Sequence, residues 1–233
     1  ISYQGADAII AYIEKRGLKL EWLIETHVHA DHLSAAPYIQ EKLGGKIGIS
    51  EKITIVQDTF GVIFNADTQF ARDGSQFDHL FRDNETYYIG KLACVALHTP
   101  GHTPACMTHV LGDAAFVGDT LFMPDAGTAR ADFPGGDAGI LFDSIQRILA
   151  LPDATRIFMC HDYQPDGREL EYLTTVADER NHNIHIGANR SKESFVALRE
   201  ARDKTLDMPR LILPSLQVNM RAGHFPEPED NNR

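Results

Sequence analysis

The sequence of 233 residues is 43% hydrophobic and 24% charged, which is typical of a globular protein with a substantial core. No uninterrupted apolar run approaches the ~20 residues that a membrane span needs, so we expect a soluble protein with no membrane partner. The formal net charge of -11 repels polyanions, and we therefore expect no nucleic-acid partner.

The cysteines indicate the redox environment. Cys94, Cys106 and Cys160 are too few and too scattered for a disulfide framework, and no C-x-x-C pair is present. We therefore expect a cytoplasmic location, with Cys106 and Cys160 as small apolar residues of the core. The chain begins with Ile1 rather than Met, so the native start, with any targeting signal, is expected to precede it.

The N-terminal region predicts a helix followed by a strand. Asp7 can cap a helix over residues 8–16, in which isoleucines share one face, and Gly17 can end it. Residues 20–25, LEWLIE, are typical of a strand that delivers the polar residues after it to the edge of a sheet.

A second helix and strand follow. Ser34 can cap a helix over residues 35–43, and residues 46–50, KIGIS, predict a strand. Residues 51–90 contain the polar, turn-rich stretch NADTQFARDGSQFDHLFRDNE. We expect loops and short elements in this part of the chain.

Apolar runs return in the middle of the sequence. Residues 91–98 and 106–122 predict strands, and a glycine and an aspartate at 112–113 break the second run in the manner of a β-hairpin. With strands and helices alternating, we expect a single α/β domain over residues 1–233.

The C-terminal part predicts three helices and one strand. Residues 139–151 have helical spacing, and residues 155–163, TRIFMCHDY, predict a buried strand. Two further helices are expected over residues 168–180 and 192–206. Residues 226–233 are rich in Pro, Glu, Asp and Asn, which predicts a disordered tail.

Residues 26–32, THVHADH, place three histidines and one aspartate directly after a predicted strand. Imidazole and carboxylate groups are ligands of zinc, iron and manganese, and an H-x-H pair offers two imidazoles from one short loop. A strand end holds such side chains through its backbone and leaves them open to a substrate.

The same residue types recur at later predicted strand ends, as TPGH at 99–102, GDT at 118–120 and CHDY at 160–163. A lone histidine at such a position most often satisfies a local hydrogen bond. Four loops of this kind instead favour a metal site, because loops that leave one edge of an α/β core can converge there.

THVHADH resembles the T-H-x-H-x-D-H signature of the metallo-β-lactamase superfamily, and TPGHTP, GDTLF and CHDY follow in the order and approximate spacing of its other metal motifs. The resemblance covers about residues 20–163. It implies an αββα sandwich with a metal site at one sheet edge. Because only 26 residues precede His27, it also predicts that the first strands of the fold are missing.

The resemblance further implies seven metal positions, divided between two sites that share one aspartate. The first site would consist of His27, His29 and His102, and the second of Asp31, His32 and His161. Asp119 would be the ligand that both sites share.

Two branches of the superfamily keep such a set and act on glutathione derivatives. They are glyoxalase II, a dinuclear thioester hydrolase, and the persulfide dioxygenases, which use one iron. Three segments are more similar to the dioxygenases: GTARADFPGG at 127–136, HDY at 161–163 and VNMRAG at 218–223. Thr128 and Ala105 depart from the common dioxygenase pattern, which bears on substrate identity more than on metal binding.

The dioxygenase resemblance implies one Fe(II) per chain, bound by His27, His102 and Asp119, with glutathione persulfide and O2 as substrates and sulfite and glutathione as products. Two histidines and one carboxylate leave coordination positions open for O2 and sulfur. The remaining metal-type residues would orient ligands and water through hydrogen bonds. These residues are His29, Asp31, His32 and His161.

The main alternative is hydrolysis. Two zinc or iron ions bound by all seven residues would activate a bridging hydroxide for attack on a thioester or lactone. A metal-binding module without turnover is a third interpretation. One iron with O2 uptake, two metals with thioester cleavage, or metal with neither activity would distinguish the three.

Two further residues are candidates for the site. Arg130 has a planar cation suited to a carboxylate, and we favour one in the protein, such as Asp162, over one on glutathione. The hydroxyl of Tyr163 either faces the substrate or is satisfied in packing, and both alternatives stay open. Apolar positions on the helix over 139–151 form either core or the interface of a homo-oligomer.

Overall fold

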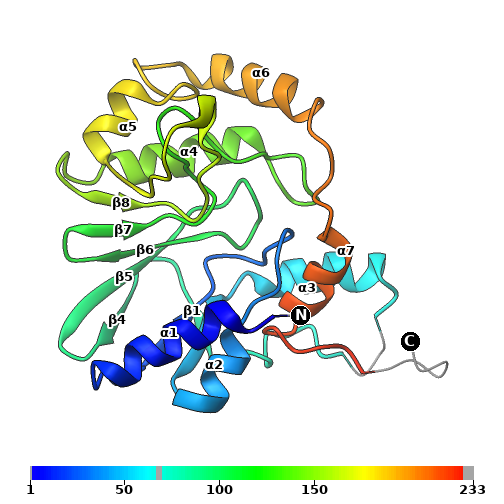
Figure 1. Cartoon of the computed structure of the whole chain (residues 1–233). Coiled ribbons are helices and arrows are strands. Elements are labelled where there is room, and N and C mark those ends of the chain that lie inside the picture. Colours follow the sequence, from blue (N-terminus) through cyan, green and yellow to red (C-terminus); the bar gives the residue numbers. More distant parts are fainter. Residues whose placement is uncertain (1, 67–69, 228–233) are drawn as a thin grey trace. The chain divides into compact units, whose positions relative to one another are not determined.

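The computed structural model describes residues 2–66 and 70–227 (Figure 1). The chain divides into two compact units. Unit 1 comprises residues 1–80 and 208–233, and unit 2 comprises residues 81–207. The expected single domain stays a prediction, and the expected disordered tail lies, from residue 228 onward, outside the described residues.

Unit 1 contains a three-stranded sheet in the order β1-β2-β3, formed by Trp22–Ile24, Lys46–Ser50 and His79–Phe81, of which Phe81 already belongs to unit 2. The strands β1 and β2 pair in parallel. Helix α2, Ala36–Leu43, connects them, as parallel strands require a crossover. The strands predicted over residues 20–25 and 46–50 are therefore confirmed.

Helix α1, Gln4–Lys15, begins earlier than predicted, and the expected cap at Asp7 is wrong. Asp7 lies in the first turn, and its carboxylate accepts a hydrogen bond from the hydroxyl of Tyr38 at 2.7 Å. The predicted end is confirmed. Gly17 has a φ of +60°, and the amides of Gly17 and Leu18 donate back to carbonyls of the last turn, a pattern that closes helices on a left-handed glycine.

Ser34 does not cap α2, because the helix begins one residue later, after Ala35. The Ser34 hydroxyl instead accepts a hydrogen bond from the amide of Ala36 and donates to Glu25. The serine therefore ties the start of the helix to the end of β1.

The expectation of loops and short elements over residues 51–90 is wrong at its beginning, where α3 spans Ile53–Ile63. The β-branched residues of this segment have low intrinsic helix propensity. The buried positions 53, 56, 57 and 61 nevertheless have the spacing of one helix face, and their burial stabilises the helix. Unit 1 is completed by α7, Ile212–Asn219, which the sequence analysis did not predict.

Unit 2 contains a six-stranded sheet in the order β4-β5-β6-β7-β8-β9. Neighbouring strands are antiparallel except for β7 and β8, which are parallel. Residues 112–113 form the predicted turn between β6 and β7. The strands are Glu85–Ile89, Leu92–His98, Met107–Leu111, Ala114–Phe116, Arg156–Phe158 and Leu173–Thr175.

Three helices accompany this sheet in Figure 1: α4, Ala138–Leu149, α5, Val176–His182, and α6, Lys192–Asp203. Side chains of all three contribute, with β7 and β8, to one buried apolar cluster. Residues 168–180 were predicted as one helix and instead form β9 and the start of α5. Two adjacent threonines favour an extended backbone there, and the backbone groups of this segment form hydrogen bonds with β8.

Candidate metal centre

The loop after β1 carries the metal-type residues of unit 1. His27 and His29 are buried, whereas Asp31 and His32 are exposed. His29, Asp31 and His32 each offer one ligand atom, and these atoms lie within 4.8 Å of one another. The loop therefore brings three possible ligands of one ion together within unit 1.

Hydrogen bonds orient the two buried rings of this loop. The hydroxyl of Thr26 lies 3.0 Å from Nδ1 of His27, so Nε2 is the ring atom that could bind a metal. Oε2 of Glu25 lies 3.3 Å from Nε2 of His29. Burial alone would raise the pKa of Glu25, but hydrogen bonds from His29 and Ser34 lower it below its usual value, so the carboxylate stays charged beside the ring.

Asn219, at the end of α7, forms hydrogen bonds from its side chain to the backbone of the same loop. Its amide Nδ2 donates to the carbonyls of His29 and His32, at 2.9 and 2.7 Å. Its Oδ1 accepts the amide of Ser34 at 2.8 Å. The segment VNMRAG carried a family resemblance in the sequence, but nothing in the sequence indicated that its asparagine contacts the histidine loop.

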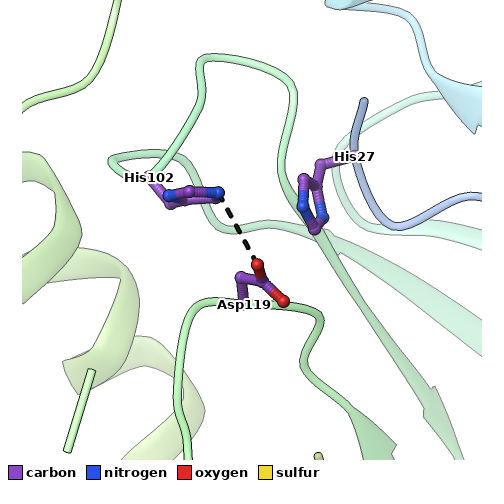
Figure 2. Close-up of side chains that lie close together, drawn as sticks. All are labelled: His27, His102 and Asp119. Atoms are coloured by element: carbon purple, nitrogen blue, oxygen red, sulfur yellow. Dashed lines mark ion pairs between the residues drawn. The ribbon is translucent and has the colours of Figure 1, made fainter. Parts of the chain in front are cut away.

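In unit 2 the corresponding residues come from three separate loops, after β5, β7 and β8. Oδ2 of Asp119 lies 3.8 Å from Nε2 of His102, the pair marked in Figure 2, and Oδ1 lies 3.5 Å from Nε2 of His161. Both distances exceed those of ordinary hydrogen bonds. Each oxygen of the Asp119 carboxylate thus faces a different imidazole. An imidazole and a carboxylate oxygen at such a separation could bind one metal ion between them.

The ring of His102 is fixed from behind. Its Nδ1 lies 2.8 Å from the backbone oxygen of Arg130, which can only accept, so Nδ1 donates and Nε2 is the ring atom that could bind a metal. Gly101 has a φ of +129°, and a Cβ at this position would lie 2.3 Å from the backbone of Leu141. Only glycine therefore lets the loop pass so close to α4.

The side chain of Arg130 is held by a protein carboxylate, as favoured from the sequence, but the partner is Asp132 rather than Asp162. Its Nε and Nη2 donate to the two oxygens of Asp132 at 2.6 and 2.7 Å, and its Nη1 donates to the carbonyl of Asp207 at 2.8 Å. The guanidinium of Arg130 holds the pKa of Asp132 below its usual value. With its fork occupied, Arg130 stabilises the segment whose carbonyl orients His102.

Asp162 pairs with Arg168, which donates to both of its oxygens at 2.6 and 2.7 Å and also to both oxygens of Asp125. The side chain of Asp162 is 1% exposed, and Arg168 lowers its pKa to about 2. The sequence analysis missed Arg168, because it placed this residue in a helix that does not form. Arg168 fixes the residue next to His161.

Cys160 and Tyr163 both follow β8. The expectation that Cys160 is a core residue is wrong, since its side chain is exposed, whereas Cys106 is buried and burial raises its pKa to about 12. Tyr163 is 65% exposed, and its ring contacts those of His161 and Phe122. Tyr163 thus lies at an exposed position shortly after His161.

The donor atoms of both units fit a metal ion. Imidazole and carboxylate without thiolate are typical of iron, zinc and manganese sites, and no lysine or arginine is among the candidate ligands.

Among the described residues, no helix is long and apolar enough to cross a bilayer.

Comparisons with known proteins agree with these motifs. Residues 2–161 match the family described as the metallo-β-lactamase superfamily. The chain is 59% identical to a probable metallo-hydrolase of Burkholderia pseudomallei (97% of this chain and 81% of that protein) and 49% identical to glyoxylase B2 of Dictyostelium discoideum (99% and 80%). It is 30% identical to the human mitochondrial persulfide dioxygenase ETHE1 (91% and 72%).

The crystal structure of ETHE1 from Myxococcus xanthus covers 95% of this chain and 85% of its own, with a TM-score of 0.76 and 30% identity. Other relatives are longer: the chain spans about half the length of the β-lactamase hydrolase-like protein of Xylella fastidiosa, covering 53% of it at 52% identity. The fold class predicted from the sequence is thereby confirmed. This chain belongs to the metallo-β-lactamase superfamily and has its fold.

Proposed function

We propose that this superfamily enzyme is an iron-dependent persulfide dioxygenase. Glutathione persulfide, O2 and water would give glutathione, sulfite and two protons. The S–S bond of the persulfide breaks, its terminal sulfur is oxidised, and O2 is reduced. Both oxygen atoms of O2 end on that sulfur, and water supplies the third oxygen of sulfite and the proton of the glutathione thiol.

The observation that carries this proposal is the environment of residues 127–136. This segment resembles the dioxygenase pattern G-x-x-R-x-D-F, and its arginine and aspartate form the two-point ion pair of Arg130 with Asp132. The carbonyl of the same arginine orients His102. The residues that resemble the dioxygenase branch therefore also orient His102, a proposed metal ligand.

The proposed iron ligands are His27, His102 and Asp119. Iron bound there would supply open coordination positions for O2 and for the persulfide sulfur. His102 keeps its Nε2 available for the metal because its Nδ1 proton is held by the carbonyl of Arg130. Asp119 is buried, with 9% of the residue exposed, so water competes little for its oxygens.

The other residues would act around this ligand set. His161 faces the second oxygen of Asp119 at 3.5 Å and would hold that carboxylate in orientation. The hydroxyl of Tyr163, an exposed residue, would donate a hydrogen bond to the substrate. His29, Asp31 and His32 would order water beside the site from the loop that carries His27.

The test is O2 uptake by the Fe(II)-loaded protein with glutathione persulfide, measured together with sulfite. We expect uptake and sulfite in equal amounts, because each turnover consumes one O2 and releases one sulfite. No uptake by protein that retains iron, together with anaerobic cleavage of a glutathione thioester, would reject the proposal.

A dinuclear hydrolase is the second candidate. The observation that favours it is that the two oxygens of Asp119 face different histidines, as a carboxylate shared by two ions would. The probable metallo-hydrolase and glyoxylase B2 among the relatives also support it. Two zinc or iron ions per chain and oxygen-independent thioester cleavage would establish this function instead.

A further inference from the structure

We propose that Asn219 is a positioning residue for metal binding, which holds the backbone of the histidine loop in its ligating conformation. The inference rests on the proposed metal centre of this chain. We expect the effect for oxidation and for hydrolysis, because the same loop carries His27, a proposed ligand in both.

The contacts of Asn219 use both donors and the acceptor of its amide. Nδ2 donates to the carbonyl oxygens of His29 and His32, and Oδ1 accepts the amide of Ser34. The residue is 5% exposed. A buried amide whose hydrogen bonds are all made within one loop constrains that loop strongly, because any displacement leaves a buried polar group unsatisfied.

The two carbonyls that Asn219 binds lie on either side of Asp31 in the sequence. Tying them to a single amide group fixes the turn between His29 and His32, and with it the directions of the three side chains. Their ligand atoms lie within 4.8 Å of one another. If this turn were free, metal binding would have to order it at a cost in affinity.

The segment that carries Asn219 is itself anchored within unit 1. Gln57 on α3 is fully buried, and it donates to the carbonyl of Met220 at 3.0 Å while accepting the amide of Gly74 at 2.9 Å. Gly223 has a φ of +85°, and a Cβ there would lie 2.7 Å from the ring of Pro37. Asn219 is thus presented to the loop from a fixed support.

The test is the change Asn219→Asp, which keeps an oxygen for the amide of Ser34 but removes both donors to the carbonyls. We expect Zn²⁺ affinity, measured by competition with a chelator, to fall about 10- to 100-fold, as for other outer partners of metal ligands. The visible spectrum of bound Co²⁺ should also change. An added negative charge alone would attract the cation, so a loss of affinity reports the lost donors.

The matched control is Gln217→Glu, the same amide-to-carboxylate change on the same helix, at a side chain that donates only to a carbonyl of its own helix. It should leave Zn²⁺ affinity unchanged. Should Asn219→Asp fail to fold, Asn219→Ser, which buries no charge, is measured instead with the same expected loss.

A lower melting temperature of the metal-free protein with unchanged Zn²⁺ affinity would overturn the inference and leave Asn219 a purely structural residue. A wild-type chain that binds no Zn²⁺, Co²⁺ or Fe²⁺ would overturn the proposed function as well. Wild-type binding that survives in the variant overturns this inference alone.

Discussion

The two units hold their metal-type side chains in different ways. In unit 1 four of them lie within six residues of one loop, and one amide, that of Asn219, holds the loop by its backbone. In unit 2 the three residues come from separate loops, and two of them have a support of their own: the carbonyl of Arg130 behind His102, and an ion pair of Arg168 beside His161.

This difference shows what a close sequence motif does and does not supply. In unit 1 the motif supplies the ligand types and their proximity together, so only the turn needs to be fixed. In unit 2 the proximity itself depends on tertiary structure, and charged pairs rather than one amide maintain it. Damage to a support should therefore have different consequences in the two units.

The largest effect is expected at Asp119, whose carboxylate faces both His102 and His161. Asp119→Asn removes the charge that faces both His102 and His161, and an amide offers one oxygen where the carboxylate offers two. Metal affinity and turnover should fall by more than the about 10- to 100-fold loss typical of an outer partner. Metal content by elemental analysis and O2 uptake measure the two quantities.

Asp113→Asn is the matched control for this change. Asp113 is an aspartate of the same unit that pairs with Arg156 at the surface, where its side chain is 72% exposed. Surface pairs contribute about 0–1 kcal/mol, so metal content and turnover should not change. Equal losses in both variants would show that net charge, rather than the position of Asp119, controls metal binding.

Much of unit 1 could be predicted because its signals are local. The strand over residues 20–25, the glycine that ends α1 and the metal-type residues of THVHADH all depend on neighbours in sequence. Two local predictions failed, the caps at Asp7 and Ser34, because each side chain has a tertiary partner instead: Tyr38 for Asp7 and Glu25 for Ser34.

The supports of the site could not be predicted, because their partners are distant in sequence. Nothing near Asn219 indicates the carbonyls of His29 and His32, which precede it by 190 and 187 positions. Arg168 was concealed by a helix that does not form: its segment has helix-forming charged residues, but the segment is followed by Leu173–Thr175, which pairs with β8 as a strand. The types of the candidate ligand residues can thus be predicted from the sequence, but the contacts that orient them cannot.

The second largest effect is expected at Arg168. Arg168→Gln leaves Asp162, whose side chain is 1% exposed, without its cation, and it should lower the free energy of unfolding at neutral pH. The folded pKa of Asp162 is about 2, below the value of about 3.9 in an unfolded chain. The ion pair therefore stabilises the fold fully above pH ~4, and this contribution is lost as the pH falls toward 2.

Urea unfolding of both proteins between pH 7 and pH 2 measures this difference. The difference in unfolding free energy between the wild type and Arg168→Gln should be largest at neutral pH and should disappear as the pH falls toward 2. Arg156→Gln, which breaks the exposed pair with Asp113, should give a smaller gap. A gap for Arg168→Gln that stays constant down to pH 2 would mean that the arginine acts through packing rather than through the charge of Asp162.

The smallest effect is expected at Tyr163, whose position tests whether unit 2 contributes a substrate contact in addition to its supports. Tyr163→Phe keeps the ring contacts with His161 and Phe122, and at a side chain 65% exposed it should leave iron content and stability unchanged. Turnover should slow about 2- to 10-fold, which corresponds to the ~0.5–1.5 kcal/mol of one hydrogen bond. Tyr172→Phe, at another exposed tyrosine of unit 2, serves as the control. If iron is lost in the Tyr163 variant, the tyrosine belongs with the supports of His161, and unit 2 would then use three separate devices to hold its three ligands.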